Sequence, residues 1–279
     1  MPYEAEISRT NPTCFLFLID QSGSMSQPFG GESGKRKSDG VADAMNRLLQ
    51  TLVFRTAKGE VILDRYHVGV IGYRDHAQGA LAGLPAQQLL VPISEIANHP
   101  VRIEQRTKKV EDGAGGLVDQ TFQFPVWFEA TAGGRTAMCE ALDLAQQAVG
   151  RFIGEHPDCF PPIVVNITDG EATDGDAEAA ASRLKAIASS DGNLLLFNAH
   201  LSSRSEQPIQ FPNSESQLPD LYARLLFRLS SPLPPGMWKQ AKTSGLPVAE
   251  GARGFVFNAD LVSVIQFLDI GTRVDKNLR

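Results

Sequence analysis

Five short apolar runs stand out along the chain. They are CFLFLI at 14–19, HVGVIGY at 67–73, IVVNIT at 163–168, LLLFNA at 194–199 and GFVF at 254–257. Their apolar character is nearly continuous and does not alternate with polar residues, as expected for strands that helices cover on both faces of a sheet. The pattern therefore predicts five buried parallel strands.

Amphipathic segments lie between these runs. Each carries apolar residues at three- and four-residue spacing, which places them on one face of a helix. The predicted helices cover the regions 41–53, 138–152, 177–187, 218–229 and 261–268. Because strand and helix alternate, we predict an α/β fold with a doubly wound, mostly parallel central sheet that helices flank on both faces.

Residues 101–128 depart from this alternation. Apolar and polar residues alternate over 101–105 and again over 122–126, and the turn-forming EDGAGG lies between them. We predict an inserted β-hairpin or a small extension of the sheet.

The remaining segments are polar connections and chain ends. We expect a flexible, basic linker at 26–39 and a polar, proline-containing surface loop at 202–217. We expect a single domain over 12–272, with terminal extensions at 1–11 and 273–279.

Composition and charge exclude some classes of protein. The net charge of −6 over 279 residues argues against general binding to nucleic acid or to an anionic membrane. The longest apolar runs are too short to span a bilayer, and the first residues do not have the pattern of a signal peptide. The three cysteines (Cys14, Cys139 and Cys159) form no CxxC motif, which fits a reducing cytosol, so we expect a cytoplasmic protein.

Polar residues follow the apolar runs where the predicted strands end. Asp20, Ser22 and Ser24 follow the first run, Asp169 follows the third, and the glycine-rich AGGRTAM at 132–138 presents Thr136. Ligands of open α/β sheets bind beyond the carboxyl ends of the strands. We therefore expect two carboxylates and three hydroxyls to converge there. These hard oxygen donors suit Mg²⁺, Mn²⁺ or Ca²⁺ better than zinc.

These segments resemble the motifs of von Willebrand factor A domains. DQSGSM at 20–25 is similar to the DxSxS motif of that family, GRTAM at 134–138 to its threonine loop, and TDG at 168–170 to its second aspartate loop. Together they resemble a complete metal-ion-dependent adhesion site. The resemblance extends over roughly residues 12–270, since strand order and helix placement also fit.

The resemblance implies a role for each residue. Ser22, Ser24 and Thr136 would bind the ion directly through neutral hydroxyls. Asp20 and Asp169 would act mainly through bound waters, although one of them can bind directly. Mg²⁺ is the expected ion, with Mn²⁺ or Ca²⁺ as alternatives. One position would stay open for a Glu or Asp of a partner protein.

The resemblance also implies a function. Cytosolic, bacterial-type members of the family look like protein–protein interaction modules without chemistry of their own. They are often paired with Ser/Thr kinases, PP2C-like phosphatases, AAA+ ATPases, or tellurite- and stress-resistance systems. We therefore expect a non-enzyme that acts as an adaptor.

Other interpretations of single motifs stay open. Asp20 and Ser22 together could begin a helix, because both residue types cap well. Thr131 is the alternative to Thr136 in the threonine loop. KRK at 35–37 and RTKK at 106–109 predict a solvated surface, with a patch for an acidic partner as the alternative.

Other polar side chains have structural roles in this interpretation. We expect Glu171, Asp174 and Asp176 to be solvated or to cap helices, and His200 to be a structural histidine at the end of a strand.

The competing function is a metal-dependent phosphohydrolase that uses Asp20. Haloacid-dehalogenase-type enzymes have a nucleophilic Asp at the end of the first strand and need a second Asp two residues later. Ser22 occupies that second position and cannot act as the acid or base. A serine hydrolase fits less well, because QSGS at 21–24 is not GxSxG.

Overall fold

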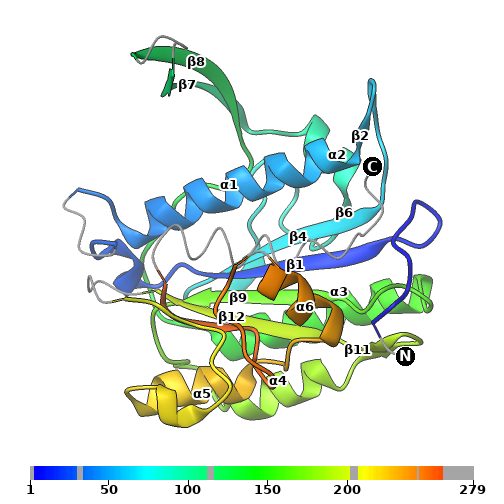
Figure 1. Ribbon diagram of the computed structural model, residues 1–279, viewed down its shortest axis with the longest axis vertical. Helices are drawn as coiled ribbons and strands as arrows, with labels where there is room; N and C mark the ends of the chain where they lie inside the picture. The colour runs from blue at the N-terminus through cyan, green and yellow to red at the C-terminus, as the bar shows by residue number, and fades with distance from the viewer. Residues whose placement is uncertain (1–2, 30–33, 112–115, 202–206, 244, 260–279) are drawn as a thin grey trace.

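The computed structural model describes residues 3–29, 34–111, 116–201, 207–243 and 245–259. These residues form an eight-stranded central sheet between two layers of helices (Figure 1). In spatial order its strands are β13 (Ile209–Gln210), β14 (Phe255–Ala259), β12 (Leu195–Leu201), β9 (Ile163–Thr168), β1 (Thr13–Asp20), β4 (Tyr66–Tyr73) and β5 (Ala77–Gly79). The short strand β6 (Val91–Pro92) also pairs with β4.

The centre of the sheet is parallel. β1 pairs in parallel with β4 and β9, and β12 pairs in parallel with β9 and β14. Antiparallel pairing is confined to β5, β6 and β13. All five predicted parallel strands are confirmed, and so is the fold class. The fourth strand begins at Leu195 and continues to Leu201, past the end of its apolar run.

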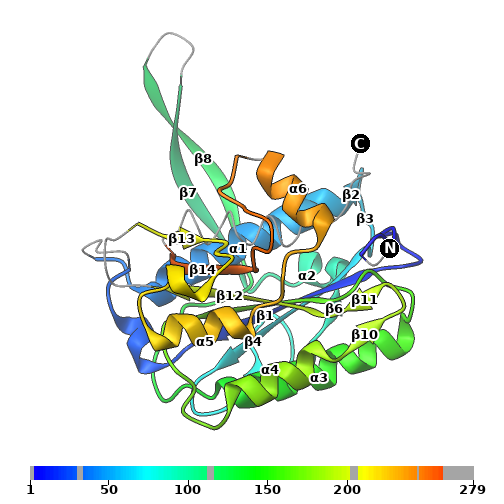
Figure 2. The same ribbon diagram turned by 60° about the horizontal axis from the view of Figure 1, so that its bottom comes forward.

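Helices cover both faces of the sheet (Figures 1 and 2). One face carries α1 (Lys37–Thr56), α2 (Ile93–Asn98) and α6 (Pro235–Thr243), and the other carries α3 (Met138–Glu155), α4 (Ala177–Lys185) and α5 (Leu221–Leu229). Alternate residues of β1 supply the two cores, with Phe15 and Phe17 on the α1 side and Leu16 and Leu18 on the α3 side. Four predicted helices are confirmed. The fifth, at 261–268, lies outside the described residues.

The smaller elements connect these layers. They are the 3-10 helices η1 (Gly23–Ser26) and η2 (Glu215–Gln217), and the two-residue strands β2 (Ala57–Lys58), β3 (Val61–Ile62), β10 (Ala188–Ser189) and β11 (Gly192–Asn193). No helix among the described residues has both the length and the apolar character needed to cross a membrane.

Parts of the two predicted loops belong to regular elements among the described residues. η1 ends at Ser26, the first residue of the predicted 26–39 linker. α1 begins within that linker at Lys37, where the Asp39 carboxylate accepts a hydrogen bond from the Arg36 backbone N–H at 3.2 Å. Within 202–217, β13 pairs with the sheet edge and Phe211 is buried. Capping and edge pairing therefore fix segments that the polar composition suggested were irregular.

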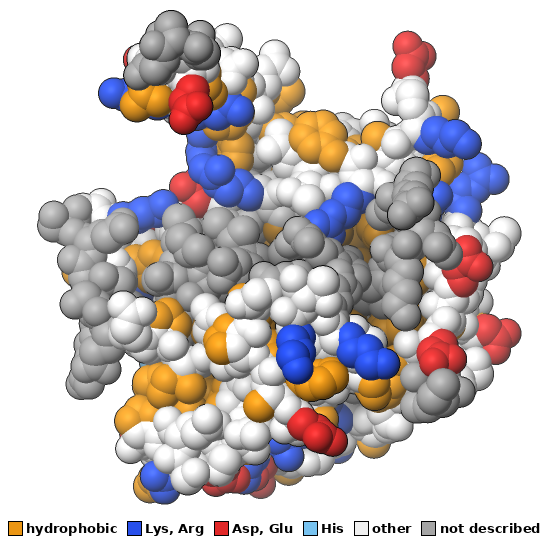
Figure 3. Space-filling view, viewed as in Figure 1, with side chains coloured by type: hydrophobic (Ala, Val, Ile, Leu, Met, Phe, Trp, Pro, Cys, Tyr) orange, Lys and Arg blue, Asp and Glu red, His pale blue; other side chains and the backbone are white. Residues whose placement is uncertain are grey.

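The predicted hairpin at 101–128 is confirmed as a separate arm. β7 (Arg102–Glu111) and β8 (Leu117–Val126) pair in antiparallel and form their own two-stranded sheet, so the alternative of a sheet extension is wrong. The arm projects from the body beside α1 (Figure 2). Exposed Ile103 and Leu117 lie on it, and hydrophobic and basic side chains stand side by side there (Figure 3).

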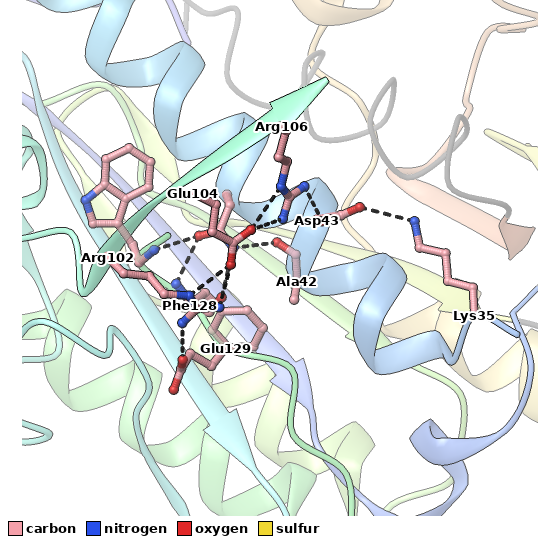
Figure 4. A network of polar contacts seen from close by, with 10 residues as sticks. Lys35, Ala42, Asp43, Arg102, Glu104, Arg106, Phe128 and Glu129 are labelled. Atoms are coloured by element: carbon pink, nitrogen blue, oxygen red, sulfur yellow. Dashed lines mark hydrogen bonds and ion pairs between the residues drawn. The ribbon is translucent and has the colours of Figure 1, made fainter. Parts of the chain in front are cut away.

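Ion pairs and hydrogen bonds connect the base of the arm to α1. Asp43 of α1 pairs with Arg106 at 2.8 Å and with Lys35 at 3.2 Å, and Arg106 also pairs with Glu104 at 2.8 Å (Figure 4). Farther along α1, the Asn46 side-chain oxygen accepts a hydrogen bond from the Trp127 backbone N–H at 2.8 Å. Lys35 and Arg106, one from each basic run of the sequence, thus both pair with the Asp43 carboxylate, and both side chains are partly buried.

A chain of buried polar groups crosses the sheet. The Tyr73 hydroxyl donates to Asn166 Oδ1 at 2.7 Å, and the Asn166 amide donates to Asn198 Oδ1 at 3.0 Å. The Asn198 amide donates to Ser230 Oγ at 2.9 Å, and Ser230 Oγ donates to the Leu226 carbonyl at 2.8 Å. Buried polar groups are costly unless they are paired, so this chain stabilises an arrangement in which β4, β9, β12 and the end of α5 keep their places.

The Tyr73→Phe substitution tests this chain. Tyr73 is fully buried, and losing its hydroxyl removes a donor from the buried Asn166 oxygen. We expect the free energy of unfolding to fall by about 1–3 kcal/mol, measured by chemical denaturation. In a Tyr73→Phe, Asn166→Leu double variant the two losses are expected to be less than additive. Strictly additive losses would contradict the coupling.

Candidate metal centre

Three loops meet at the carboxyl edge of the sheet. Asp20 ends β1 and is paired in register with Tyr73 at the end of β4, while Ile19 of β1 is paired with Ile167 of β9. The residues that follow these strands therefore leave the sheet at the same level. The first loop contains the DxSxS-like segment, and the loop after β9 contains Asp169.

Backbone hydrogen bonds join these loops to the threonine loop. The Gly23 N–H donates to the Gly134 carbonyl at 3.1 Å, and the Gly133 N–H donates to the Gln21 carbonyl at 2.8 Å. On the other side, the Thr173 N–H donates to the Thr136 carbonyl at 3.0 Å. Backbone bonds thus hold the loops together, leaving the hydroxyls of the predicted site available for other contacts.

Gly134 is required by the shape of the threonine loop. Its φ of +82° lies in the left-handed region, and a Cβ at this position would meet Asp75 Oδ2 at 2.5 Å. The other oxygen of Asp75 accepts a hydrogen bond from the Arg135 backbone N–H at 3.2 Å. Asp75, which follows β4, can therefore hold the threonine loop through this hydrogen bond only when residue 134 has no side chain.

Four of the five predicted site residues meet around Ser24. The Ser22 and Ser24 hydroxyls are hydrogen-bonded at 3.0 Å, and Ser24 Oγ donates to Asp169 Oδ1 at 2.6 Å. A Cβ built on Gly170 would lie 3.9 Å from both Ser24 Oγ and Thr136 Oγ1, so these two hydroxyls face the same small space. The structure thus brings together hydroxyls and a carboxylate from all three loops.

Asp20 lies beneath this group and is almost fully buried. One of its oxygens accepts the Ser22 backbone N–H at 2.8 Å, and the other accepts the Thr168 hydroxyl at 2.7 Å. Burial raises the pKa of Asp20 to about 6 against the opposing effect of these hydrogen bonds, and the nearby Asp169 raises it further. Asp20 therefore shapes the first loop as well as adding negative charge beneath the hydroxyls.

The charged partner of Asp169 is a residue that the sequence did not suggest. Lys37 Nζ lies 2.7 Å from Asp169 Oδ2, with the lysine side chain 5% exposed and the aspartate side chain 0% exposed. The expectation that KRK at 35–37 is a solvated surface is wrong for Lys37, because this carboxylate draws its ammonium inward. One signal was present in the sequence: a lysine in the first turn of a helix opposes the helix dipole and calls for an anionic partner.

Two more residues pack around the loop after β9. The Tyr222 hydroxyl, from α5, donates to the Gly170 carbonyl. His200 stacks on Phe257 at 4.6 Å, and its Nδ1 accepts the Asn258 N–H at 3.3 Å. Burial and, to a lesser extent, Lys37 lower the pKa of His200 to about 4, so it packs as a neutral ring. The expected structural role of His200 is confirmed.

The acidic residues after Asp169 mostly cap helices, as predicted. Asp176 accepts hydrogen bonds from the Glu178 and Ala179 backbone at the start of α4. Asp174 accepts the Cys139 and Glu140 N–H groups at the start of α3. Glu171 is exposed. Ser22 precedes η1 but makes no capping hydrogen bond through its side chain, which disfavours a purely capping role for the first motif.

The donor set fits a hard divalent cation. Neutral hydroxyls and carboxylates surround the space between Ser24, Thr136 and Asp169. In the part of the chain that the structure describes, no three His, Cys, Asp or Glu side chains form a group that could hold a metal. Such oxygen ligands suit Mg²⁺, which keeps some of its waters in protein sites.

No protein-family model matches the chain, and no curated protein matches it. Among solved structures, it is similar to proximal thread matrix protein 1 from the mussel byssus with a zinc-occupied MIDAS motif, at 14% identity and a TM-score of 0.49, covering 97% of this chain and 49% of that one. It is also similar to the vWF domain of a type V pili tip protein from Porphyromonas gingivalis, at 12% identity and a TM-score of 0.34, covering 58% and 39%.

A third similar structure is the PilB minor pilin from Streptococcus sanguinis, at 14% identity and a TM-score of 0.34, covering 61% of this chain and 31% of that one. The chain spans less than half the length of these three proteins.

Gly134→Ala, compared with Gly150→Ala, tests the shape of the threonine loop. The left-handed φ at Gly134 costs about 1–2 kcal/mol for any other residue, and the Asp75 carboxylate adds a clash. We expect a lower melting temperature, measured by calorimetry. At Gly150 of α3 an added Cβ meets nothing within 4 Å, so alanine is expected to stabilise by about 0.5–1 kcal/mol. Equal effects of the two substitutions would refute this account of the loop.

Proposed function

We propose that the chain is a metal-dependent protein–protein interaction module. A divalent ion at Asp20, Ser22, Ser24, Thr136 and Asp169 would receive an acidic residue of a partner protein. The observation that carries the proposal is the contact of Ser22, Ser24 and Asp169 across two loops, with the Thr136 hydroxyl facing the same space. The three motifs in which these residues stand, in this order, support it as well.

The expected ion is Mg²⁺, with Mn²⁺ or Ca²⁺ as alternatives. Ser22, Ser24 and Thr136 would bind it through neutral oxygens, while Asp169 and the deeper Asp20 would hold its waters. Mg²⁺ takes six oxygens, so such a set leaves a replaceable water on the solvent side. A carboxylate that arrives there meets an ion only partly neutralised by its own protein, and the attraction grows as the interface excludes water.

The setting we propose is an adaptor in the cytoplasm of a bacterium. The motif resemblance supports a partner such as a Ser/Thr kinase, a PP2C-like phosphatase or an AAA+ ATPase in a signalling or stress system. The location is supported by Cys14, Cys139 and Cys159, which are all free thiols and all buried.

The geometry disfavours the competing phosphohydrolase. A nucleophilic Asp must present an oxygen to the substrate, yet the buried Asp20 uses one oxygen for the Ser22 N–H and the other for the Thr168 hydroxyl. Ser22 stands where the second Asp of such enzymes is needed. A binding role without catalysis therefore fits the site better.

Titration of the protein with Mg²⁺ and Mn²⁺ by calorimetry tests the ion site. We expect one ion per chain. Asp20→Ala is expected to abolish binding, because the variant loses a negative charge and the acceptor that holds the Ser22 loop. The titration is run at pH 7.5, above the pKa of about 6 for Asp20, so that this carboxylate is charged.

A second variant separates loss of charge from loss of shape. Asp20→Asn removes the charge and keeps one oxygen for the Ser22 backbone N–H, while its NH2 group replaces the oxygen that accepts the Thr168 hydroxyl. It is expected to remain folded and to bind the ion weakly. Unchanged affinity in both variants, each confirmed as folded by its cooperative melting, would rule out Asp20 as part of the ion site.

The partner's carboxylate is tested by a double-mutant cycle on a protein captured with Mg²⁺ and released by EDTA. Thr136→Ala is expected to weaken binding by about 1–3 kcal/mol, as for the loss of a buried polar contact. Changing the partner's Glu or Asp to Gln or Asn is expected to have a comparable effect, and the two changes together a less than additive one.

Thr131→Ala is the matched control for this cycle, because Thr131 is the alternative threonine of the same loop. It is expected to leave binding unchanged. Full affinity in EDTA would show that the partner does not bind through the ion. If Thr131→Ala weakened binding and Thr136→Ala did not, Thr131 would be the threonine that binds the ion.

A further inference from the structure

Lys37 lies inside the candidate metal centre. Its side chain is 5% exposed, and its ammonium is 2.7 Å from an oxygen of the fully buried Asp169 side chain. Contacts with Gln27 hold the lysine in place: the Lys37 backbone N–H donates to the Gln27 carbonyl at 2.9 Å, and the ammonium lies 3.3 Å from Gln27 Oε1. Lys37 is therefore anchored at both its backbone and its charged end.

The lysine uses the carboxylate that the ion needs. Asp169 Oδ1 accepts the Ser24 hydroxyl at 2.6 Å, and Asp169 Oδ2 accepts the Lys37 ammonium. An ion bound between Ser24 and Thr136 draws on Asp169 directly or through a water, and the ammonium already occupies one of the two oxygens. Asp169 therefore cannot interact at full strength with the Lys37 ammonium and with the ion at the same time.

The charges of the site also indicate that Lys37 opposes binding of the ion. Asp20 and Asp169 supply two negative charges to the site, and Lys37 cancels one of them at its closest point. A dication in this space therefore meets a positive charge at short range in surroundings from which water is largely excluded, where electrostatic interactions are strong.

We propose that Lys37 sets the affinity of the site for its divalent ion by competing with that ion for Asp169. The inference rests on the proposed function, because it concerns the same ion. Lys37 balances the buried Asp169 when no ion does so, and ion binding requires the ammonium to give up its place beside Oδ2. The lysine thus makes the site weaker than its oxygen donors alone would be.

Lys35 provides a matched control. It is two residues away on the same chain segment and carries the same charge, but it pairs with Asp43 at 3.2 Å and its side chain is 30% exposed. A long-range effect of positive charge would appear with either lysine. Competition for Asp169 would be lost on substitution of Lys37 and not on substitution of Lys35, because only Lys37 of these two lysines pairs with Asp169.

The test is calorimetric titration of the full chain with Mg²⁺ and Mn²⁺. Lys37→Met keeps an unbranched apolar side chain, one atom shorter than that of lysine, and removes the charge. We therefore expect the ion to bind at least about tenfold more tightly than in the unchanged protein. Lys35→Met and the charge-preserving Lys37→Arg are expected to show no such gain. Lys37→Gln repeats the test in case the Met variant does not fold.

Melting temperature gives a second readout. Without added ion, Lys37→Met is expected to melt at a lower temperature, since Asp169 loses its countercharge. Mg²⁺ is then expected to raise the melting temperature more in this variant than in the unchanged protein.

The outcomes separate this inference from the proposed function. If the unchanged protein binds the ion and the folded Lys37→Met and Lys37→Gln variants bind it equally or more weakly, competition by Lys37 is overturned and the ion site stands. Binding that appears only in the Lys37 variants supports the inference. Absence of binding in every protein overturns the ion site and the inference with it.

Discussion

A carboxylate buried at or just after the end of a strand needs hydrogen-bond donors or a countercharge, and this requirement shapes the carboxyl edge of the sheet. Asp20 receives the Ser22 N–H and the Thr168 hydroxyl, while Asp169 receives the Ser24 hydroxyl and the Lys37 ammonium. Without such partners, either charge would cost several kcal/mol to bury. The loop after β1, the loop after β9 and the start of α1 are thus arranged around two acidic groups.

Much of the fold could be predicted because it depends on local patterns. The apolar run at 163–168 and the helical stripe at 138–152 identify their elements directly, and each lies in the structure within a few residues of its predicted place. The site followed from one further step, since the carboxyl ends of parallel strands meet at the same edge. That step placed Ser22, Ser24 and Asp169 together, as the structure has them.

What the sequence did not predict depends on contacts between distant segments. Lys37 stands in a run of basic residues whose neighbours are solvated or paired at the surface, and only the tertiary position of Asp169 turns it inward. The hairpin was evident from its alternation, but alternation does not say which edge a strand will pair with. Contacts such as Asp43 with Arg106 hold the arm against α1 and apart from the central sheet.

The buried polar chain from Tyr73 to Ser230 also bears on how the strands find their alignment. The central strands are built largely of Val, Leu, Ile and Phe, residues similar enough to pack acceptably after a shift along the strand. The paired amides of Asn166 and Asn198 are not interchangeable with these neighbours. A shift of β9 by one residue would turn the Asn166 amide to the opposite face, away from Tyr73 and Asn198, and would leave the buried Asn198 oxygen without the donor it has here. The amides therefore favour the alignment in which Asn166 is bonded to both Tyr73 and Asn198, and misaligned sheets lose these hydrogen bonds.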